Sequence, residues 1–373
     1  MNNWKDCKLG DAPFEIIDGD RGKNYPKKDE FFESGYCLFL NTKNVTTNGF
    51  KFTELNFITK EKDERLRKGK LKRYDLVLTT RGTVGNVGFY NKNIPFDNMR
   101  INSGMVIIRP NGINEKFNYQ LFKYLKRDFK IFTSGSAQPQ LPIRDLKEIS
   151  FLFPPLPEQR AIASVLSSLD DKIDLLHRQN RTLEAMAETL FRQWFVEEAK
   201  EDWEQGKLGE IIDISSGKGL KKKEYVENGS YPVLGANGEI GRTDKCLFDE
   251  KLIFTGRVGT LGKIFISTGK VWLSDNTLVI KPKEDFFYFV YFLLKDIKLE
   301  GYNVGSTQPL IRQSDIKEIE ILLSGKEQLY NFETEADLFF KKIQNNQLQI
   351  RILEQLRDAL LQNLMSGEVR VEV

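Results

Sequence analysis

The chain has 373 residues, a net charge of +3, and 40% hydrophobic and 29% charged residues, so it has room for two or three globular domains. It shows no apolar run of about 18 residues and no apolar signal segment, so we expect neither a membrane span nor export. Its three scattered cysteines fit a reducing compartment, and we expect a cytoplasmic protein.

Residues 1–154 are predicted to form a mostly-β domain. Short apolar runs at 36–40, 76–79 and 105–108 are typical of strands, and 117–132 of a helix. Residues 1–156 hold 27 Lys and Arg against 18 Asp and Glu, and this excess favours a polyanionic partner.

Two basic runs account for much of this charge, and flexible basic arms of this kind contact phosphates. The alternative is that they are solvated surface loops. The candidate DNA-binding residues in them are Arg21, Lys23, Lys27, Lys28, Arg65, Arg67, Lys68, Lys70, Lys72 and Arg73.

Residues 155–200 are predicted to form a long helix after the proline run at 154–157, because proline stops the preceding segment from being helical. Apolar residues recur at alternating steps of four and three, as in a coiled coil with one polar position. They are Ile162, Leu166, Leu169, Ile173, Leu176, Asn180, Leu183, Ala187, Leu190 and Trp194.

The chain then repeats its own pattern about 170 residues later. Gly-Ser-x-Gln-Pro at 135–139 returns at 305–309, and Asp-Leu-Lys-Glu-Ile at 145–149 returns as Asp-Ile-Lys-Glu-Ile at 315–319. Shorter matches pair 4–10 with 203–209 and 84–88 with 258–262. This period is too long for a solenoid, so it predicts two copies of a whole module.

Residues 201–323 are therefore predicted to form a second mostly-β domain. Its basic run, Lys218, Lys221, Lys222 and Lys223, lies at a position similar to the first run of copy one, although 201–325 carry 17 Lys and Arg against 19 Asp and Glu. Glycine-rich turns at 80–85 and 255–259 carry Arg81 and Arg257 as further DNA-binding candidates. Glycine there serves either a tight turn or close approach to a ligand, and Gln138 and Gln308 are either structural or read a base edge.

Residues 324–373 are predicted to form a second long helix with almost the same spacing. Its apolar positions are Ala336, Phe339, Ile343, Asn346, Ile350, Leu353, Leu356, Leu360 and Leu364. We expect the two helices, each roughly 60 Å long, to pair as an antiparallel coiled coil; the alternative is that each packs on its own domain. The prediction is an α+β, pseudo-two-fold and circularly symmetric fold.

Enzyme motifs are missing. The sequence contains neither a P-loop nor a dinucleotide fingerprint, and its one histidine, His177, falls on a predicted helix flank, so we expect no catalytic and no metal site.

Each copy has the same order of parts: a globular domain, then Gly-Ser-x-Gln-Pro, Asp-Leu-Lys-Glu-Ile, Pro-Pro-Leu-Pro-Glu-Gln in the first copy, and a long helix. This order, repeated once, resembles that of the specificity subunits of type I restriction-modification systems. The resemblance covers the whole chain, although the second copy lacks the proline run at 324–328. It implies two target recognition domains that each read half of a bipartite site on double-stranded DNA, with the coiled coil setting the spacer.

The resemblance also implies the partners. These are two methyltransferase subunits and, through them, restriction and translocase subunits, with S-adenosylmethionine, ATP and Mg²⁺ held by those partners and no cofactor in this chain. A stand-alone DNA-binding scaffold or repressor, or a divergent nuclease or methyltransferase, is the alternative.

Overall fold

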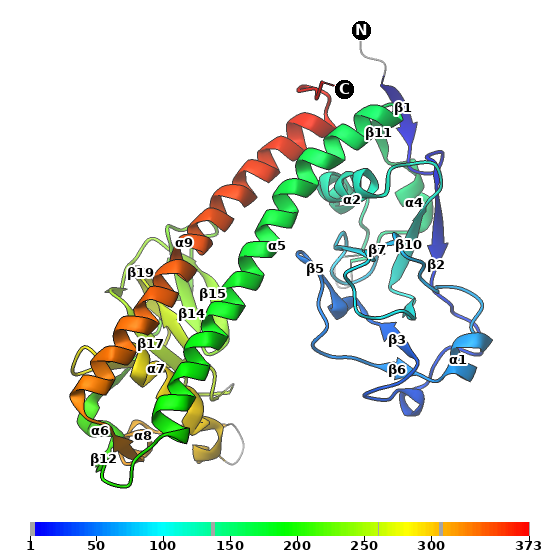
Figure 1. Ribbon diagram of the computed structural model, residues 1–373. Helices are drawn as coiled ribbons and strands as arrows, with labels where there is room; N and C mark the ends of the chain where they lie inside the picture. Colours follow the sequence, from blue (N-terminus) through cyan, green and yellow to red (C-terminus); the bar gives the residue numbers. More distant parts are fainter. Residues whose placement is uncertain (1–3, 136–138, 260, 306–308, 373) are drawn as a thin grey trace. The chain divides into compact units, whose positions relative to one another are not determined.

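A computed structural model describes residues 4–135, 139–259, 261–305 and 309–372 (Figure 1). The chain forms two compact units: unit 1 holds the residues up to 175 together with those from 349 onward, and unit 2 holds 176–348. Each unit combines one mostly-β domain with parts of two long helices, α5 (Leu156–Arg192) and α9 (Lys326–Met365). A short π-helical turn, Gln193–Glu197, follows α5.

Domain 1, the segment from β1 to β11, is built on a four-stranded antiparallel sheet with the order β2-β10-β7-β8. Its strands are β2 (Phe14–Asp18), β10 (Met105–Pro110), β7 (Leu76–Thr79) and β8 (Val87–Phe89). A second sheet pairs β3 (Cys37–Leu40) in parallel with β9 (Met99–Ile101) and antiparallel with β6 (Phe57–Ile58). The hairpin β4 (Val45–Thr46) and β5 (Gly49–Phe50) lies beside β8 in the fold.

Short helices complete domain 1. They are α1 (Lys60–Arg65), α2 (Glu115–Tyr124), α3 (Lys126–Ile131) and α4 (Ile143–Glu148). The single helix predicted at 117–132 is thus two helices, because Leu125 leaves helical geometry between α2 and α3. Finally, β1 (Lys5–Lys8) pairs with β11 (Ser150–Phe153), which leads directly into α5.

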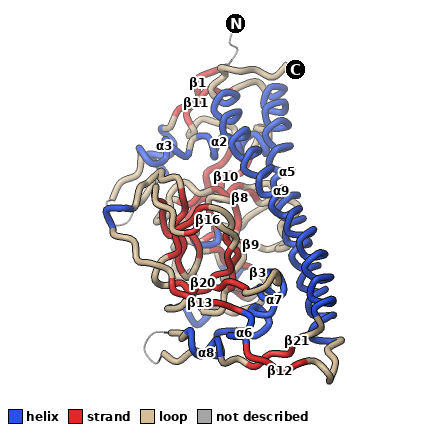
Figure 2. Tube along the Cα trace, turned by 90° about the vertical axis from the view of Figure 1, so that its left-hand side faces the viewer, coloured by secondary structure: helices blue, strands red, loops and turns tan. Residues whose placement is uncertain are grey.

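Domain 2, the segment from β12 to β21, repeats this topology. Its main sheet has the order β13-β20-β17-β18, with β13 (Ile212–Ser216), β20 (Thr277–Pro282), β17 (Leu252–Gly256) and β18 (Ile264–Ser267). The second sheet again contains a parallel pair, β14 (Tyr231–Gly235) with β19 (Lys270–Leu273), extended by β15 (Gly238–Thr243) and β16 (Phe248–Asp249). The helices are α6 (Leu208–Ile211), α7 (Phe287–Ile297) and α8 (Gln313–Lys317). Figure 2 shows β12 (Glu204–Lys207) beside β21 (Glu320–Leu323), as β1 lies beside β11.

The long helices pair antiparallel within each unit. In unit 1, Asp170 of α5 contacts Arg357 of α9, whereas Glu158 near the start of α5 contacts Arg370 beyond the end of α9. In unit 2, Asn180 bonds Asn346, and the Trp194 carbonyl accepts from Gln328. In both units, residue numbers rise along one helix and fall along the other. The α+β fold with an antiparallel helix pair is confirmed.

Trp4 and Arg370, which lie near the two ends of the described chain, share a partner in unit 1. Trp4 donates its indole N–H to Glu158, 2.9 Å away, and the same carboxylate pairs with Arg370. Gly367 lies against the Trp4 ring at a φ of +75°, a conformation that favours glycine. The end of copy two therefore leads back toward the start of copy one.

Candidate nucleic-acid interface

The two basic runs of domain 1 form one surface. The buried Asp20 carboxylate accepts the backbone N–H groups of Gly22 and Arg67 at 2.7 Å each. Asn24 donates to the Arg65 carbonyl at 3.2 Å, and Lys62 pairs with Glu30 at 2.7 Å. Residues far apart in sequence are thus fixed side by side, which concentrates positive charge on one face.

The segment 60–73 is a folded strap and not the flexible arm that the sequence predicted. It begins with α1, capped by Thr59, and then follows β9, with the Leu71 N–H donating to Met99. The buried Arg100 guanidinium holds the strap through the Asp63 carboxylate and the carbonyls of Leu66 and Lys68. A charged side chain that is 4% exposed needs such complete pairing, so the strap's path is firmly set.

Burial alone would raise the pKa of Asp63, but its hydrogen bonds from Lys70 and Arg100 hold it below the usual carboxylate value. Asp63 therefore stays ionised near neutral pH and keeps both cations in place.

The structure divides the predicted basic residues of domain 1 into two groups. Lys70 is tied to Asp63, Arg21 pairs with Asp18 at 3.2 Å, and Arg73 pairs with Asp97 at 2.7 Å while covering the Tyr90 ring. The others present exposed side chains at the surface: Lys23, Lys27, Lys28, Arg65, Arg67, Lys68 and Lys72. The second group is the better placed to contact phosphates.

The basic run of domain 2 is built like the first run of domain 1. In both, a 3-10 turn follows a lysine whose N–H donates to a glutamate three residues later, Lys27 to Glu30 and Lys221 to Glu224. That glutamate also pairs with a lysine from elsewhere in its domain, Lys245 in the case of Glu224. Lys218, Lys221, Lys222 and Lys223 all have exposed side chains.

The glycine-rich turns are structural partners of the Gly-Ser-x-Gln-Pro motifs. The N–H of Gly82 donates to the Pro139 carbonyl at 3.0 Å, and Gly259 donates to Pro309 at the same distance. Both glycines have positive φ, which favours the tight-turn interpretation. Gln138 and Gln308 lie outside the described residues.

Arg81 and Arg257 do not occupy equivalent positions, contrary to what their shared turns suggested. Arg81 pairs in a bridge with Gln140, and its counterpart in domain 2 is Val258, which pairs with Leu310. Arg257 precedes Val258 and is the counterpart of Thr80. The Thr80 carbonyl accepts the N–H of Leu141, and the Arg257 carbonyl accepts the equivalent N–H of Ile311. The offset of one residue turns the two guanidinium groups to different surroundings.

Both arginines are partly exposed at the same end of their sheets. Arg81 follows β7 beside a hollow of about 440 Å³ that is lined mainly by hydroxyl and amide side chains. The hollow is lined by Thr42, Lys43, Val45, Thr46, Thr47, Gly82, Thr83 and Asn86. Arg257 follows β17 and lies 3.4 Å from the Ser216 hydroxyl at the end of β13.

The predicted seam residues all lie on the helix pair, except Trp194, which lies in the π-helical turn after α5. Ten are buried: Ile162, Leu166, Ile173, Leu176, Ala187, Ala336, Ile343, Asn346, Ile350 and Leu364. Eight are partly buried: Leu169, Asn180, Leu183, Leu190, Trp194, Phe339, Leu353 and Leu360. Leu356 was predicted wrongly as a seam residue, because its side chain is exposed and the neighbouring Arg357 turns inward to Asp170.

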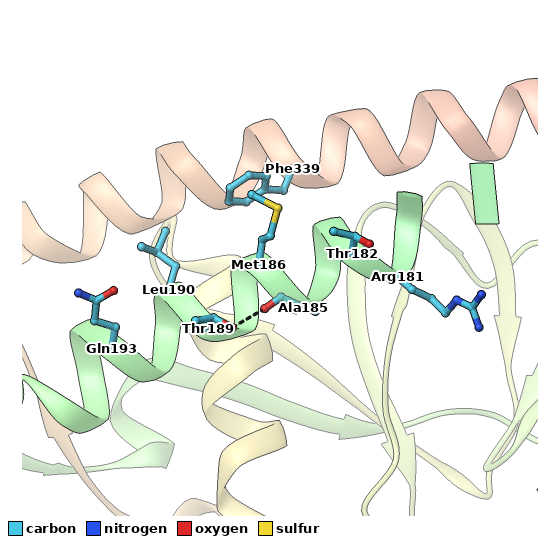
Figure 3. A pocket seen from close by; sticks show the side chains of 8 residues that line it. All are labelled: Arg181, Thr182, Ala185, Met186, Thr189, Leu190, Gln193 and Phe339. Carbon is cyan, nitrogen blue, oxygen red and sulfur yellow. Dashed lines mark hydrogen bonds between the residues drawn. The ribbon is translucent and has the colours of Figure 1, made fainter. Parts of the chain in front are cut away.

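Apolar side chains also line a groove between the two long helices in unit 2. Met186 and Leu190 of α5 face Phe339 of α9 across a hollow of about 580 Å³ (Figure 3). Met186 is 49% exposed, which is unusual for a thioether in a helix pair.

The described residues hold no cluster of three His, Cys, Asp or Glu side chains arranged to bind a metal ion. None of the helices in the described ranges is both long and apolar enough to cross a bilayer. His177 is exposed on α5.

Comparison with known proteins decides the family. The family model described as "Type I restriction modification DNA specificity domain" matches residues 1–185 and 200–362. The chain belongs to this family. The type I restriction enzyme MjaIX specificity subunit of Methanocaldococcus jannaschii is 30% identical over 80% of this chain and 78% of its own length. The HindI specificity subunit of Haemophilus influenzae is 22% identical over 99% of this chain and all of its own length.

A solved structure shares the fold. The crystal structure of the S subunit of a type I restriction-modification system from M. genitalium covers 98% of this chain and 97% of its own, with 21% identity and a TM-score of 0.56. By its family model and these curated relatives, the chain is a specificity subunit, a sequence-specific DNA-recognition component without catalysis of its own.

Proposed function

We propose that this specificity subunit reads a bipartite DNA site, with domain 1 reading one half and domain 2 the other. The observation that carries the proposal is the duplication itself: two domains share one topology but present different side chains at equivalent surface positions. A duplicated scaffold with divergent surface chemistry is suited to two different short sequences.

In this proposal, the exposed basic side chains of both domains contact phosphates and give affinity. Base contacts come from the sheet ends that carry Arg81 and Arg257. Methylation mapping of DNA from cells that carry this subunit and its methyltransferase tests the proposal. We expect two specified half-sites separated by a fixed number of unspecified bases, whereas a single contiguous site would contradict it.

We further propose that the helix pair sets that spacer. Helices of 37 and 40 residues are about 55–60 Å long, and a stiff element of this length makes the spacer a geometric constant. Removal of one heptad from each helix, at matched seam positions, keeps the apolar phase and shortens the element by about 10 Å. The preferred spacer should shorten; an unchanged spacer would show that the helices do not set it.

The helix pair also supplies two docking positions, and we assign one methyltransferase subunit to each. In unit 2 the position is the groove of Met186, Leu190 and Phe339. In unit 1 the residues at the same places in the repeat are Leu356, Leu360 and Leu169, and Leu356 is 46% exposed. Because both copies keep apolar side chains there, the same kind of partner fits both units. The methyltransferase subunits would carry S-adenosylmethionine, and restriction and translocase subunits that join through them would supply the sites for ATP and Mg²⁺.

Stoichiometry by native mass spectrometry tests this assignment. Met186→Asp and Leu356→Asp should each reduce the number of bound methyltransferase subunits from two to one, and the double variant should bind none. Leu338→Asp, at an apolar α9 residue that is 58% exposed outside the groove, is the matched control and should bind two. Full binding by the double variant would refute the assignment, and binding of any methyltransferase argues against a stand-alone repressor.

A further inference from the structure

Three residues from separate elements meet at the end of the main sheet of domain 2. Ser216 ends β13, Arg257 follows β17, and Gln313 begins α8. The Ser216 hydroxyl accepts from the Gln313 amide at 2.9 Å and from the Arg257 guanidinium at 3.4 Å. One hydroxyl therefore fixes two long polar side chains, both partly exposed.

The Arg257 side chain is incompletely hydrogen-bonded by the residues that the structure describes. Its Nε is buried and has no hydrogen-bond partner among the described residues. Hydrogen bonds normally satisfy buried polar atoms, and an arginine fork with spare donors suits a planar acceptor pair. In the described part of the chain no carboxylate pairs with this guanidinium, unlike Arg21, which pairs with Asp18 in domain 1.

The repeat shows that these positions are free to vary while the scaffold is kept. The residues of domain 1 at the equivalent places are Asp18, Thr80 and Ile143, at the ends of β2 and β7 and the start of α4. The backbone pairings around them are the same in both domains. Thus the side chains at all three positions differ between the two domains, although the backbone around them is the same. This is the pattern expected of residues that determine which DNA sequence each domain reads.

We propose that Arg257 is a specificity-determining residue of domain 2 that reads a guanine in its half-site, and that Ser216 and Gln313 position it. Arginine donates two parallel hydrogen bonds to the O6 and N7 atoms of guanine, and each good bidentate pair discriminates by about 1–3 kcal/mol against other bases. Lys218, two residues after Ser216 and exposed, contacts the adjoining backbone phosphate. This inference rests on the proposed reading of one half-site by each domain.

Methylation mapping with the complete subunit and its methyltransferase tests the inference. Arg257→Ala should relax one guanine of the domain 2 half-site to any base, with a loss of preference of roughly 5- to 150-fold, and should leave the domain 1 half-site unchanged. Gln313→Ile, which installs the residue found at the equivalent position of domain 1, should relax the same base more weakly. Arg312→Ala, at the exposed neighbouring arginine, is the matched control and should keep the motif.

The outcomes separate the two levels of the proposal. If wild-type methylation shows a bipartite site and both Arg257→Ala and Arg257→Lys keep its full motif, the assignment of Arg257 is wrong while the proposed function stands. If wild type shows no bipartite site, the proposed function itself fails. If Arg257→Ala does not fold, Arg257→Lys and Gln313→Ile decide, because lysine keeps the charge but loses the fork; an unchanged base preference in both overturns the inference.

Discussion

The two domains attach to the helix pair through different chemistry. In unit 1, α2 and the helices share a buried apolar cluster to which Leu121, Leu166 and Leu361 belong. Beside it lies a polar cluster in which Gln120, Lys123 and Arg357 surround Asp170, with distances of 2.8 to 3.3 Å. In unit 2, α7 meets them through packed aromatic rings. These rings belong to Phe191, Phe195, Phe289, Phe292, Phe332 and Phe340.

A common origin is still visible in the two attachments. Tyr119 and Lys123 of α2 correspond to Tyr291 and Lys295 of α7, and Lys295 pairs with Glu184 and Glu188 of α5. The comparison teaches that the repeat preserves an apolar contact with the helices, to which unit 1 adds a polar cluster and unit 2 a set of packed aromatic rings. A buried aromatic cluster stabilises by burying area, whereas a buried ion pair gives little net stability but is costly to break on one side.

The largest expected effect is therefore in unit 2. Phe332→Ala removes a fully buried ring from the centre of the cluster and should cost about 3–5 kcal/mol of unfolding free energy. Urea denaturation measures it. Tyr330→Ala, at an aromatic α9 residue that is 49% exposed, is the control and should cost about 1 kcal/mol or less. Equal costs for the two variants would show that the cluster does not hold domain 2.

Breaking the polar cluster of unit 1 should cost less. Asp170→Ala leaves Lys123 and Arg357 without their shared partner, and because Asp170 is about a quarter exposed we expect a loss of about 1–3 kcal/mol. Burial already lowers the pKa of Lys123, so this variant should lower it further. Adding Lys123→Met should recover part of the loss in a double-mutant cycle; strictly additive effects would contradict a shared cluster.

The last expected effect is a pH dependence that arises in unit 2. Glu333 of α9 accepts the backbone N–H of Phe289 at the start of α7, and burial raises its pKa to about 7. Because this pKa is above the unfolded value, the contribution of Glu333 to stability is full below about pH 4.5 and is lost as pH rises through 7.

Glu333→Gln keeps an acceptor for the Phe289 N–H but does not titrate. It should abolish this pH dependence and raise stability above pH 7 by at most about 3 kcal/mol, which is the free energy that corresponds to a pKa raised from 4.5 to about 7. Thermal unfolding between pH 5 and 9 measures it. The result contradicts the assignment if the variant and the wild type lose stability in parallel over that range.

The sequence predicted the parts of this fold that depend on local pattern. The heptad spacing predicted both helices, and the repeated motifs predicted two similar domains. The error at Leu356 arose because the seven-residue pattern allows the side chain of either Leu356 or Arg357 to face the other helix. Arg357 takes this position because it pairs with Asp170 of α5.

The candidate interface was less predictable because it depends on distant partners. Arg100 orders the strap but lies far from Asp63 along the sequence, so the sequence of the strap alone suggested a flexible arm. The one-residue offset between Arg81 and Arg257 appears only in the bridge partners of the two turns. No sequence signal marked Gln313, since its role depends on its contact with Ser216.

The measurement that most directly tests two independent readers is methylation mapping of a chimera. Domain 1 of this chain is replaced, from β1 to β11, by that of a relative with a different methylation site, while α5, domain 2 and α9 are kept. The account predicts that one half-site changes to that of the relative, while the other half-site and the spacer stay the same. A change in both half-sites, or in neither, would contradict it.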